Sequence, residues 1–219
     1  MAISLYTISA ICGNFKVEST VNPGTYESLH YLTPSELVDN SIYGGYGLGQ
    51  WTNKQEWGLT RRTQLIQWLR DNGYSDDDGN GQLSYLLYEN YWHQNVGEYA
   101  TLTDFLNNES TNISELTRIW MRNWEGINSD TLSDRQSWAN RFYNYISEHY
   151  LDQDINTWIT GNRYLSEMEM KNNAVLVARF LWDNPTPPPY PTPEHITLLM
   201  IAGKKHKKRK KKLLTKRFI

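Results

Sequence analysis

A glutamate at the end of an apolar helix is the first residue here that could carry out chemistry. In residues 11–24, ICGNFKVESTVNPG, Glu18 precedes an Asn-Pro-Gly turn signal that predicts a helix end near Thr20. A carboxyl group at the edge of an apolar stripe loses hydration, which disfavours its charged form and raises its pKa. Glu18 is therefore a candidate general acid. The alternative is an ordinary surface glutamate, since charged side chains usually stay exposed.

A glycine-rich segment follows roughly thirty residues later. Residues 43–51, YGGYGLGQW, hold four glycines in nine positions, a composition that lets backbone approach a ligand closely. Tyr46 and Trp51 offer flat apolar faces, and Gln50 can both donate and accept hydrogen bonds. These residue types suit sugars, which have apolar ring faces and hydroxyl edges. A phosphate loop is excluded because no Gly-Lys-Ser/Thr follows, whereas a β-hairpin with glycine bends is compatible with a sugar site.

The two segments together resemble the phage tail lysozyme family and, more distantly, the soluble lytic transglycosylases. Five stretches between about Ile8 and Tyr150 carry the resemblance: GNFKVESTVNPG, GYGLGQWT, RRTQLIQWL, NGYSDDDGNGQLSYL and IWMRNWEGI. It implies a mostly α, lysozyme-like (α+β) fold with a small β-hairpin over a groove. It also implies cleavage of the β-1,4 bond between N-acetylmuramic acid and N-acetylglucosamine in peptidoglycan, with Glu18 as the general acid.

Other site residues follow from the same resemblance. Gln50 and Tyr46 would position the sugar, Trp51 would contribute to substrate binding, and Ser19 would orient Glu18 or the substrate.

The second catalytic carboxylate is left open by the sequence. Glu27, Glu36 and Asp39 all lie between the two motifs. If one of them faces Glu18, the mechanism is hydrolysis by water with two carboxylates. If none does, substrate-assisted chemistry or a transglycosylase-type internal attack is the alternative. Glu125 could border the groove, but a helix-end salt bridge is the favoured interpretation for it.

Apolar residues at helical spacing predict further helices over 61–69, 83–91 and 116–124, and a capping box at 133–136 predicts the start of another. About 150 residues can bury a sound core, so residues 1–150 are expected to form the lysozyme-like catalytic domain. The single cysteine, Cys12, lies on the apolar stripe of the first helix. We assign it to core packing, because one cysteine can form neither an intrachain disulfide nor a Cys-based zinc site.

An acidic loop at 76–84 partly matches an EF-hand. Asp76, Asp78 and Asn80 take loop positions 1, 3 and 5, but Leu87 stands at position 12, where a bidentate glutamate is needed. An acidic Asp-Gly loop needs no metal, so we predict no metal site and no cofactor.

Residues 170–182, MKNNAVLVARFLW, resemble the helix that usually begins the tail lysozyme family. This chain starts almost directly at the next helix of that pattern. A circular permutation would explain the order, with residues 151–182 as a helical extension that completes the core beside residues 5–19. Val175, Leu176, Phe180 and Leu181 should then contact the 5–19 helix.

The composition changes again towards the C-terminus. Residues 183–193 read as a rigid proline-rich linker, and residues 194–219 as a short apolar segment followed by a basic arm. The apolar run at 196–202 is too short to span a bilayer. Residues 204–219 hold ten of the 22 Lys and Arg, which leaves 12 basic against 24 acidic residues in the first 203, a net charge of −12. Such an arm favours docking to DNA, an acidic protein or an anionic membrane surface.

The N-terminal sequence predicts no signal peptide, since Lys and Arg are absent before Lys16. The enzyme would therefore reach the wall through a holin-type lesion or as part of a virion, and the phage tail is the favoured location, with tail proteins as partners. A rival interpretation is a catalytically inactive virion protein whose basic arm docks DNA or a neighbouring protein.

Overall fold

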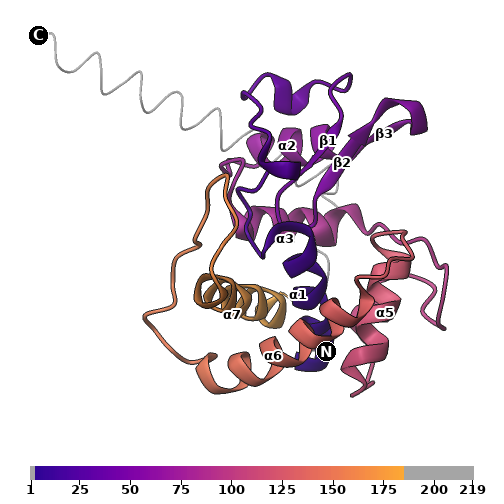
Figure 1. The fold of residues 1–219 in the computed structure, drawn as a ribbon, viewed down its shortest axis with the longest axis vertical. Helices are drawn as coiled ribbons and strands as arrows, with labels where there is room; N and C mark the ends of the chain where they lie inside the picture. Colours follow the sequence, from indigo (N-terminus) through magenta and orange to yellow (C-terminus); the bar gives the residue numbers. More distant parts are fainter. Residues whose placement is uncertain (1–2, 185–219) are drawn as a thin grey trace, which may run out of the picture. The chain divides into compact units, whose positions relative to one another are not determined.

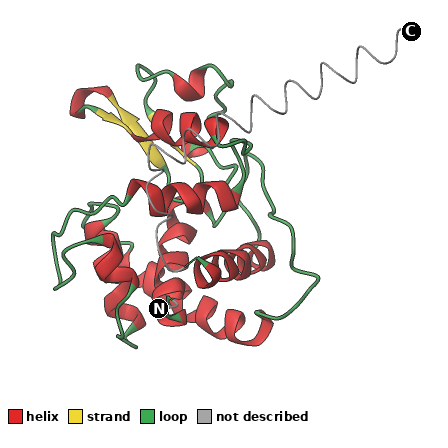
Figure 2. Cartoon of the chain, turned by 180° about the vertical axis from the view of Figure 1, so that it is seen from behind, coloured by secondary structure: helices red, strands yellow, loops and turns green. Residues whose placement is uncertain are grey.

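The computed structural model describes residues 3–184, which belong to one compact unit, Met1–Pro187. Helices predominate, and a small sheet lies beside them (Figures 1 and 2). The helices are α1 (Leu5–Ser19), α2 (Arg61–Asp71), α3 (Gly79–Glu89), α4 (Leu102–Leu106), α5 (Ile113–Asn123), α6 (Leu132–His149) and α7 (Glu167–Asp183). The strands are β1 (Gly44–Tyr46), β2 (Trp51–Lys54) and β3 (Leu59–Thr60), and short 3-10 helices occupy Glu27–Leu29, Glu36–Val38 and Gln55–Trp57. This architecture confirms the predicted lysozyme-like α+β class.

The central element is α1, which packs against α5, α6 and α7 (Figure 1). The hydroxyl of Ser4 caps its start by accepting a hydrogen bond from the backbone N–H of Thr7 at 3.2 Å. At its end, Thr20 adopts a left-handed conformation with φ 56°, so the helix ends where the sequence predicted. The predicted apolar stripe, including Cys12, is buried. Glu18 is consequently held on the last turn of the best-packed helix of the fold.

The sheet is antiparallel, with the order β1-β2-β3. Its register pairs Tyr46 with Trp51, and the tight turn between them begins at Gly47, which has φ 79°. Trp51 is fully buried, and its ring packs edge-on against that of Trp124 at the end of α5, with centroids 5.5 Å apart. Gly49 also lies against Trp124 and leaves no room there for a side chain. The predicted hairpin is therefore present and is fixed to the helical core.

The α7 helix packs beside both α1 and α6, which confirms the predicted contact. Val175 and Leu181 are buried in the same core as α1, while Leu176 and Phe180 are partly buried. The side-chain amide of Asn173 donates to the backbone oxygen of Val21 at 2.9 Å, just beyond α1. Residues 151–184 thus complete the core, and the circular permutation stays a prediction.

Two local predictions were wrong. The helix α6 begins at Leu132, before the expected capping box, so Ser133 lies within the helix and makes no cap. Gln136 instead donates to the backbone oxygen of Ser114 on α5 at 2.9 Å. The helix expected over 83–91 also ends earlier than predicted. α3 ends at Glu89, and Tyr91 lies in the loop beyond it.

The side chains of the acidic loop make contacts within the protein. Asp78 is the N-cap of α3 and accepts a hydrogen bond from the N–H of Gly81 at 2.9 Å. Asp76 pairs with Arg70 at 2.7 Å. Within residues 3–184, no group of three His, Cys, Asp or Glu side chains could hold a metal ion, and no helix is long and apolar enough to cross a membrane. Most of the proline-rich linker, the short apolar segment and the basic arm lie outside the described residues.

Candidate active site

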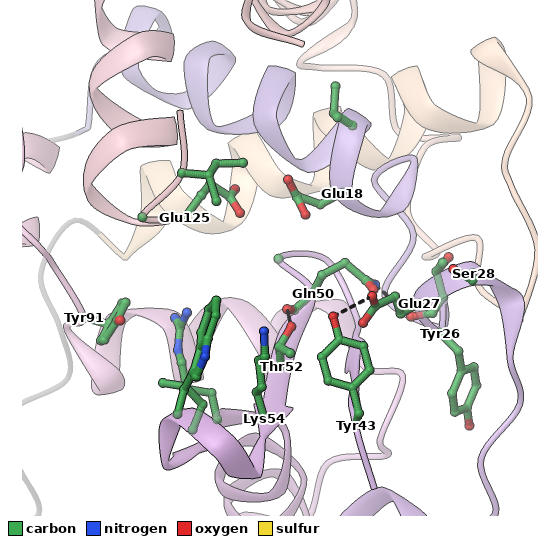
Figure 3. A pocket seen from close by; sticks show the side chains of 18 of the residues that line it. Glu18, Tyr26, Glu27, Ser28, Tyr43, Gln50, Thr52, Lys54, Tyr91 and Glu125 are labelled. Carbon is green, nitrogen blue, oxygen red and sulfur yellow. Dashed lines mark hydrogen bonds between the residues drawn. The ribbon is translucent and has the colours of Figure 1, made fainter. Parts of the chain in front are cut away.

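A pocket of about 610 Å³ lies between the end of α1 and the sheet (Figure 3). Glu18 and Glu125 face each other on one side of it, and residues of the hairpin lie on the other side. Its lining comprises Val17, Glu18, Thr25, Tyr26, Glu27, Ser28, Tyr43, Gly49, Gln50, Thr52, Lys54, Trp57, Leu59, Arg61, Tyr91, His93, Glu125, Gly126, Ile127 and Tyr164.

Glu18 lines the pocket with 19% of its side chain exposed, enough for contact with a ligand. Its Oε1 accepts a hydrogen bond from Nη2 of Arg135 on α6 at 2.5 Å. Arg135 is itself buried and donates also to Asn14 on α1, at 2.9 Å, and to Thr131, at 3.1 Å. The predicted apolar surroundings of Glu18 therefore include a fixed guanidinium, which holds this carboxyl group in place through a charge-assisted hydrogen bond.

Glu125 is a second carboxyl group in the same wall of the pocket. It lies just beyond α5, its side chain is 6% exposed, and its Oε1 is buried without a hydrogen-bond partner. Nη1 of Arg135 lies 3.8 Å from this oxygen. Burial raises the pKa of Glu125 well above its ordinary value, and the carboxylate of Glu18 raises it further, while Arg135 and Arg61 act in the opposite direction. Glu125 thus forms a salt bridge, as the favoured interpretation had it, and it also borders the pocket beside Glu18.

Gln50 lines the pocket in an unusual backbone conformation, with φ 49°. Its side-chain nitrogen donates to the backbone oxygens of Thr25, at 3.1 Å, and Gly47, at 3.0 Å. Because both partners are acceptors, the amide orientation is fixed and the oxygen must face away from them. That oxygen, Oε1, is buried and has no hydrogen-bond partner. Gln50 is therefore held rigidly in the pocket lining, with its acceptor oxygen covered by the protein beside Gly45.

The three other residues predicted to bind substrate are buried and do not line the pocket. The hydroxyl of Ser19 donates to the backbone oxygen of Leu48 at 2.8 Å, which ties α1 to the hairpin turn. The indole N–H of Trp51 donates to Glu89 at 3.0 Å, and Tyr46 is 2% exposed. In this structure the polar atoms of Ser19 and Trp51 and the ring of Tyr46 are engaged within the core, and their role in substrate binding stays a prediction. Nothing in the sequence indicated which faces of the hairpin would be covered.

The structure separates the three candidates for the second carboxylate. Glu27 lines the pocket and accepts hydrogen bonds from the N–H of Gly45 at 2.7 Å and the hydroxyl of Tyr43 at 3.2 Å. Glu36 and Asp39 are not part of the lining, and each accepts hydrogen bonds within its own turn. Glu27 is therefore the candidate that a substrate in the pocket could meet, from the side opposite Glu18 (Figure 3).

Sequence comparison shows the family of the chain. Residues 2–146 match the family model described as phage tail lysozyme. The chain belongs to this family. It is also 32% identical over 87 residues to Morphogenesis protein 1 of Bacillus phage B103, a match that covers 38% of this chain and about a fifth (20%) of the relative's length. Membership confirms the resemblance carried by the five stretches and supports a lysozyme-like, peptidoglycan-cleaving enzyme in general.

Proposed function

We propose that the protein is a peptidoglycan hydrolase that cleaves the β-1,4 bond between N-acetylmuramic acid and N-acetylglucosamine. The observation that supports this most strongly is the pair Glu18 and Glu125, two carboxyl groups on either side of the Arg135 guanidinium in the wall of one pocket. Glycosidases rely on carboxyl groups placed in different environments, one of which keeps a proton near neutral pH.

Glu18 donates the proton to the leaving glycosidic oxygen. It is the more exposed of the two carboxyl groups, and it is the one that a sugar in the pocket can touch. The two carboxyl groups share one proton. Burial places it on Glu125 in the resting site, and it passes to Glu18 before Glu18 donates it to the substrate. Arg135 lies beside both groups and compensates the single negative charge that they carry in the resting site.

Glu27 acts as the base for the attacking water. It is held by Gly45 and Tyr43 on the hairpin side of the pocket, opposite Glu18 (Figure 3). General acid and base on opposite faces of the sugar are the arrangement that hydrolysis by direct attack of water requires. The products should therefore carry free reducing ends rather than 1,6-anhydro ends. Gln50 lines the pocket and is the residue of the hairpin turn that a sugar next to the scissile bond would meet.

The enzyme is carried by the phage tail and opens the bacterial wall during DNA entry. The family description and the morphogenesis protein of phage B103 support a place in the particle. In this proposal, tail proteins are partners of the chain, and DNA is a second partner through residues 204–219.

The test is lysis of purified cell walls by Glu18→Gln. The amide keeps the shape of the side chain and cannot donate a carboxylic proton, so activity should fall about 10²- to 10⁴-fold, the usual contribution of a general acid. Glu148→Gln on α6, whose side chain is 75% exposed and lies outside the pocket lining, is the matched control and should lyse like the wild type. Unchanged lysis by Glu18→Gln would refute the assignment, and an inactive wild type would favour the structural rival.

A further inference from the structure

The far end of the pocket is formed by the turn between β2 and β3. Lys54, Trp57 and Leu59 line it there, and the register of the sheet pairs Lys54 with Leu59. The turn brings Trp57 back beside Lys54, with Nζ 3.3 Å from the centre of the indole ring. Trp57 is 69% exposed, whereas the tryptophans of the core are buried. An exposed indole at a pocket wall is thus presented to whatever enters the pocket.

Lys54 has a positive charge that the protein leaves uncompensated. The other basic residues of the site are committed, because Arg61 binds Glu89 through two hydrogen bonds of 2.7 and 2.8 Å and Arg135 binds Glu18. Among residues 3–184, no carboxylate lies within ion-pairing distance of Lys54, and its recorded partner is the indole ring.

The side chain of Lys54 is directed so that its charge is available to a ligand in the pocket. Figure 3 shows its amine pointing into the pocket. An ammonium group has three N–H donors, and its contact with the indole ring leaves donors available for a ligand. The carboxylates of Glu18 and Glu27 would repel an anion from the centre of the pocket, so an anionic group on a ligand is favoured at the Lys54 end.

We propose that Lys54 and Trp57 form a subsite for a carboxylate borne by a sugar ring. In peptidoglycan this is the carboxylate of the lactyl ether of N-acetylmuramic acid, or of the peptide attached to it. The indole packs on the apolar face of the sugar while the ammonium pairs with the carboxylate. The inference rests on the proposed function and adds to it a means of separating peptidoglycan from glycans of N-acetylglucosamine alone, which lack this group.

The test compares Lys54→Gln with the wild type on three tetrasaccharides. One contains N-acetylmuramic acid with its peptides, one has had the peptides removed to leave free lactyl carboxylates, and one is chitotetraose. Lys54→Gln should raise KM about 2- to 5-fold on the carboxylate-bearing glycans, the effect expected of one solvent-accessible ion pair, and leave kcat and the chitotetraose reaction unchanged. A loss on the peptide-free glycan identifies the lactyl group as the ligand, and a loss confined to the peptide-bearing glycan identifies the peptide.

The matched control is Lys171→Gln, the same change on α7 outside the pocket lining, which should leave all three reactions as in the wild type. Trp57→Ala should weaken binding of all three glycans, since the ring face binds the sugar itself. Equal effects of Lys54→Gln on all three glycans, or no effect on any, would overturn the subsite.

Equilibrium binding separates this inference from the proposed function. Measured in the Glu18→Gln background, where no cleavage is expected, the Lys54→Gln change should still weaken binding of the carboxylate-bearing glycans selectively. If the wild type fails to cleave while this selective loss remains, the proposed chemistry is wrong and the subsite holds. If cleavage depends on Glu18 while Lys54→Gln leaves the binding of all three glycans unchanged, the proposed chemistry holds and the subsite is wrong.

Discussion

At the scale of single residues, the site depends on how one guanidinium is shared. Arg135 touches Glu18 at 2.5 Å and lies 3.8 Å from Glu125, so a single positive charge faces two carboxyl groups. Two full negative charges there would leave one uncompensated in a poorly hydrated wall, which is costly. The buried group of the pair is therefore the one expected to stay neutral, and Glu125 is the more buried.

Glu125→Gln tests this directly through pH. The pKa of Glu125 is raised in the folded protein, so between the ordinary glutamate value and the raised one the folded state binds more protons than the unfolded state. The free energy of unfolding of the wild type must then fall as pH rises over that range, by at most about 1.4 kcal/mol per pH unit from this group. The neutral amide removes this dependence, so the Tm of Glu125→Gln relative to the wild type should rise from pH 5 to pH 8.

The control for this measurement is Glu148→Gln, whose difference in Tm from the wild type should vary little with pH. A difference for Glu125→Gln that stays constant from pH 5 to pH 8 would show that Glu125 is charged in the folded protein over this range. Wall lysis by Glu125→Gln near neutral pH should fall about 10²- to 10⁴-fold, because the amide cannot supply the shared proton that Glu18 donates.

The sequence predicted part of the site for identifiable reasons. Glu18 and Gln50 stand out because a carboxylate at a helix end and a glycine-rich turn are local signals. Arg135 carries no such signal, since an arginine within an amphipathic helix is usually a solvated residue, and its burial follows from the packing of α6 on α1. Ser19 and Trp51 lie in the core and not in the pocket lining, which could not be foreseen because alternation along a short hairpin does not say which face the core covers.

At the scale of elements, the distance between α1 and α6 sets the geometry of Arg135. Gly13 makes the close approach possible, because a Cβ at this position would lie 2.5 Å from the backbone oxygen of Arg135 and 2.7 Å from Cβ of Ala139. Real Cβ contacts are never so short, so any side chain at Gly13 must move α6. The catalytic contact between Arg135 and Glu18 thus depends on a residue that has no side chain.

Helix propensity and packing predict opposite effects of Gly13→Ala on the stability of the protein. Alanine is the better helix former by about 1 kcal/mol, which alone would stabilise α1. Overpacking against α6 costs about 1–3 kcal/mol, and since the clash involves backbone, we expect the cost to dominate. The variant should therefore unfold at lower denaturant concentration and lyse walls more slowly. Increased stability would show that α6 can move without cost, and unchanged lysis would show that Arg135 need not be held so closely.

The helices were the most predictable elements and their ends the least. The end of α1 was correct because an Asn-Pro-Gly turn and a left-handed Thr20 allow no continuation. The start of α6 was wrong, because the Ser133–Gln136 spacing imitates a cap, whereas Gln136 finds its partner on α5. Tertiary contacts of this kind are invisible to local patterns.

At the scale of the whole molecule, catalysis and docking are assigned to different parts of the chain. All the residues discussed as the site lie within the compact unit Met1–Pro187, and α7 is packed into its core. Residues 204–219 carry ten basic residues and no acidic ones, opposite in sign to the net charge of −12 on the rest. A basic arm beyond a proline-rich linker suits attachment to an acidic protein of the tail, with DNA as the second candidate.

Deletion of residues 204–219 should therefore separate the two roles. Cleavage of a soluble glycan should stay within about twofold of the wild type at high ionic strength, because general-acid catalysis requires the pocket and not the arm. Incorporation into particles should fall. If DNA is the partner, binding of the intact chain to duplex DNA should weaken steeply with salt, since each neutralised phosphate releases counterions, and the deletion should abolish it. An arm of equal length with every Lys and Arg replaced by Ser is the matched control and should behave like the deletion, because charge carries the docking. Loss of glycan cleavage together with normal incorporation would show that the arm serves the pocket instead.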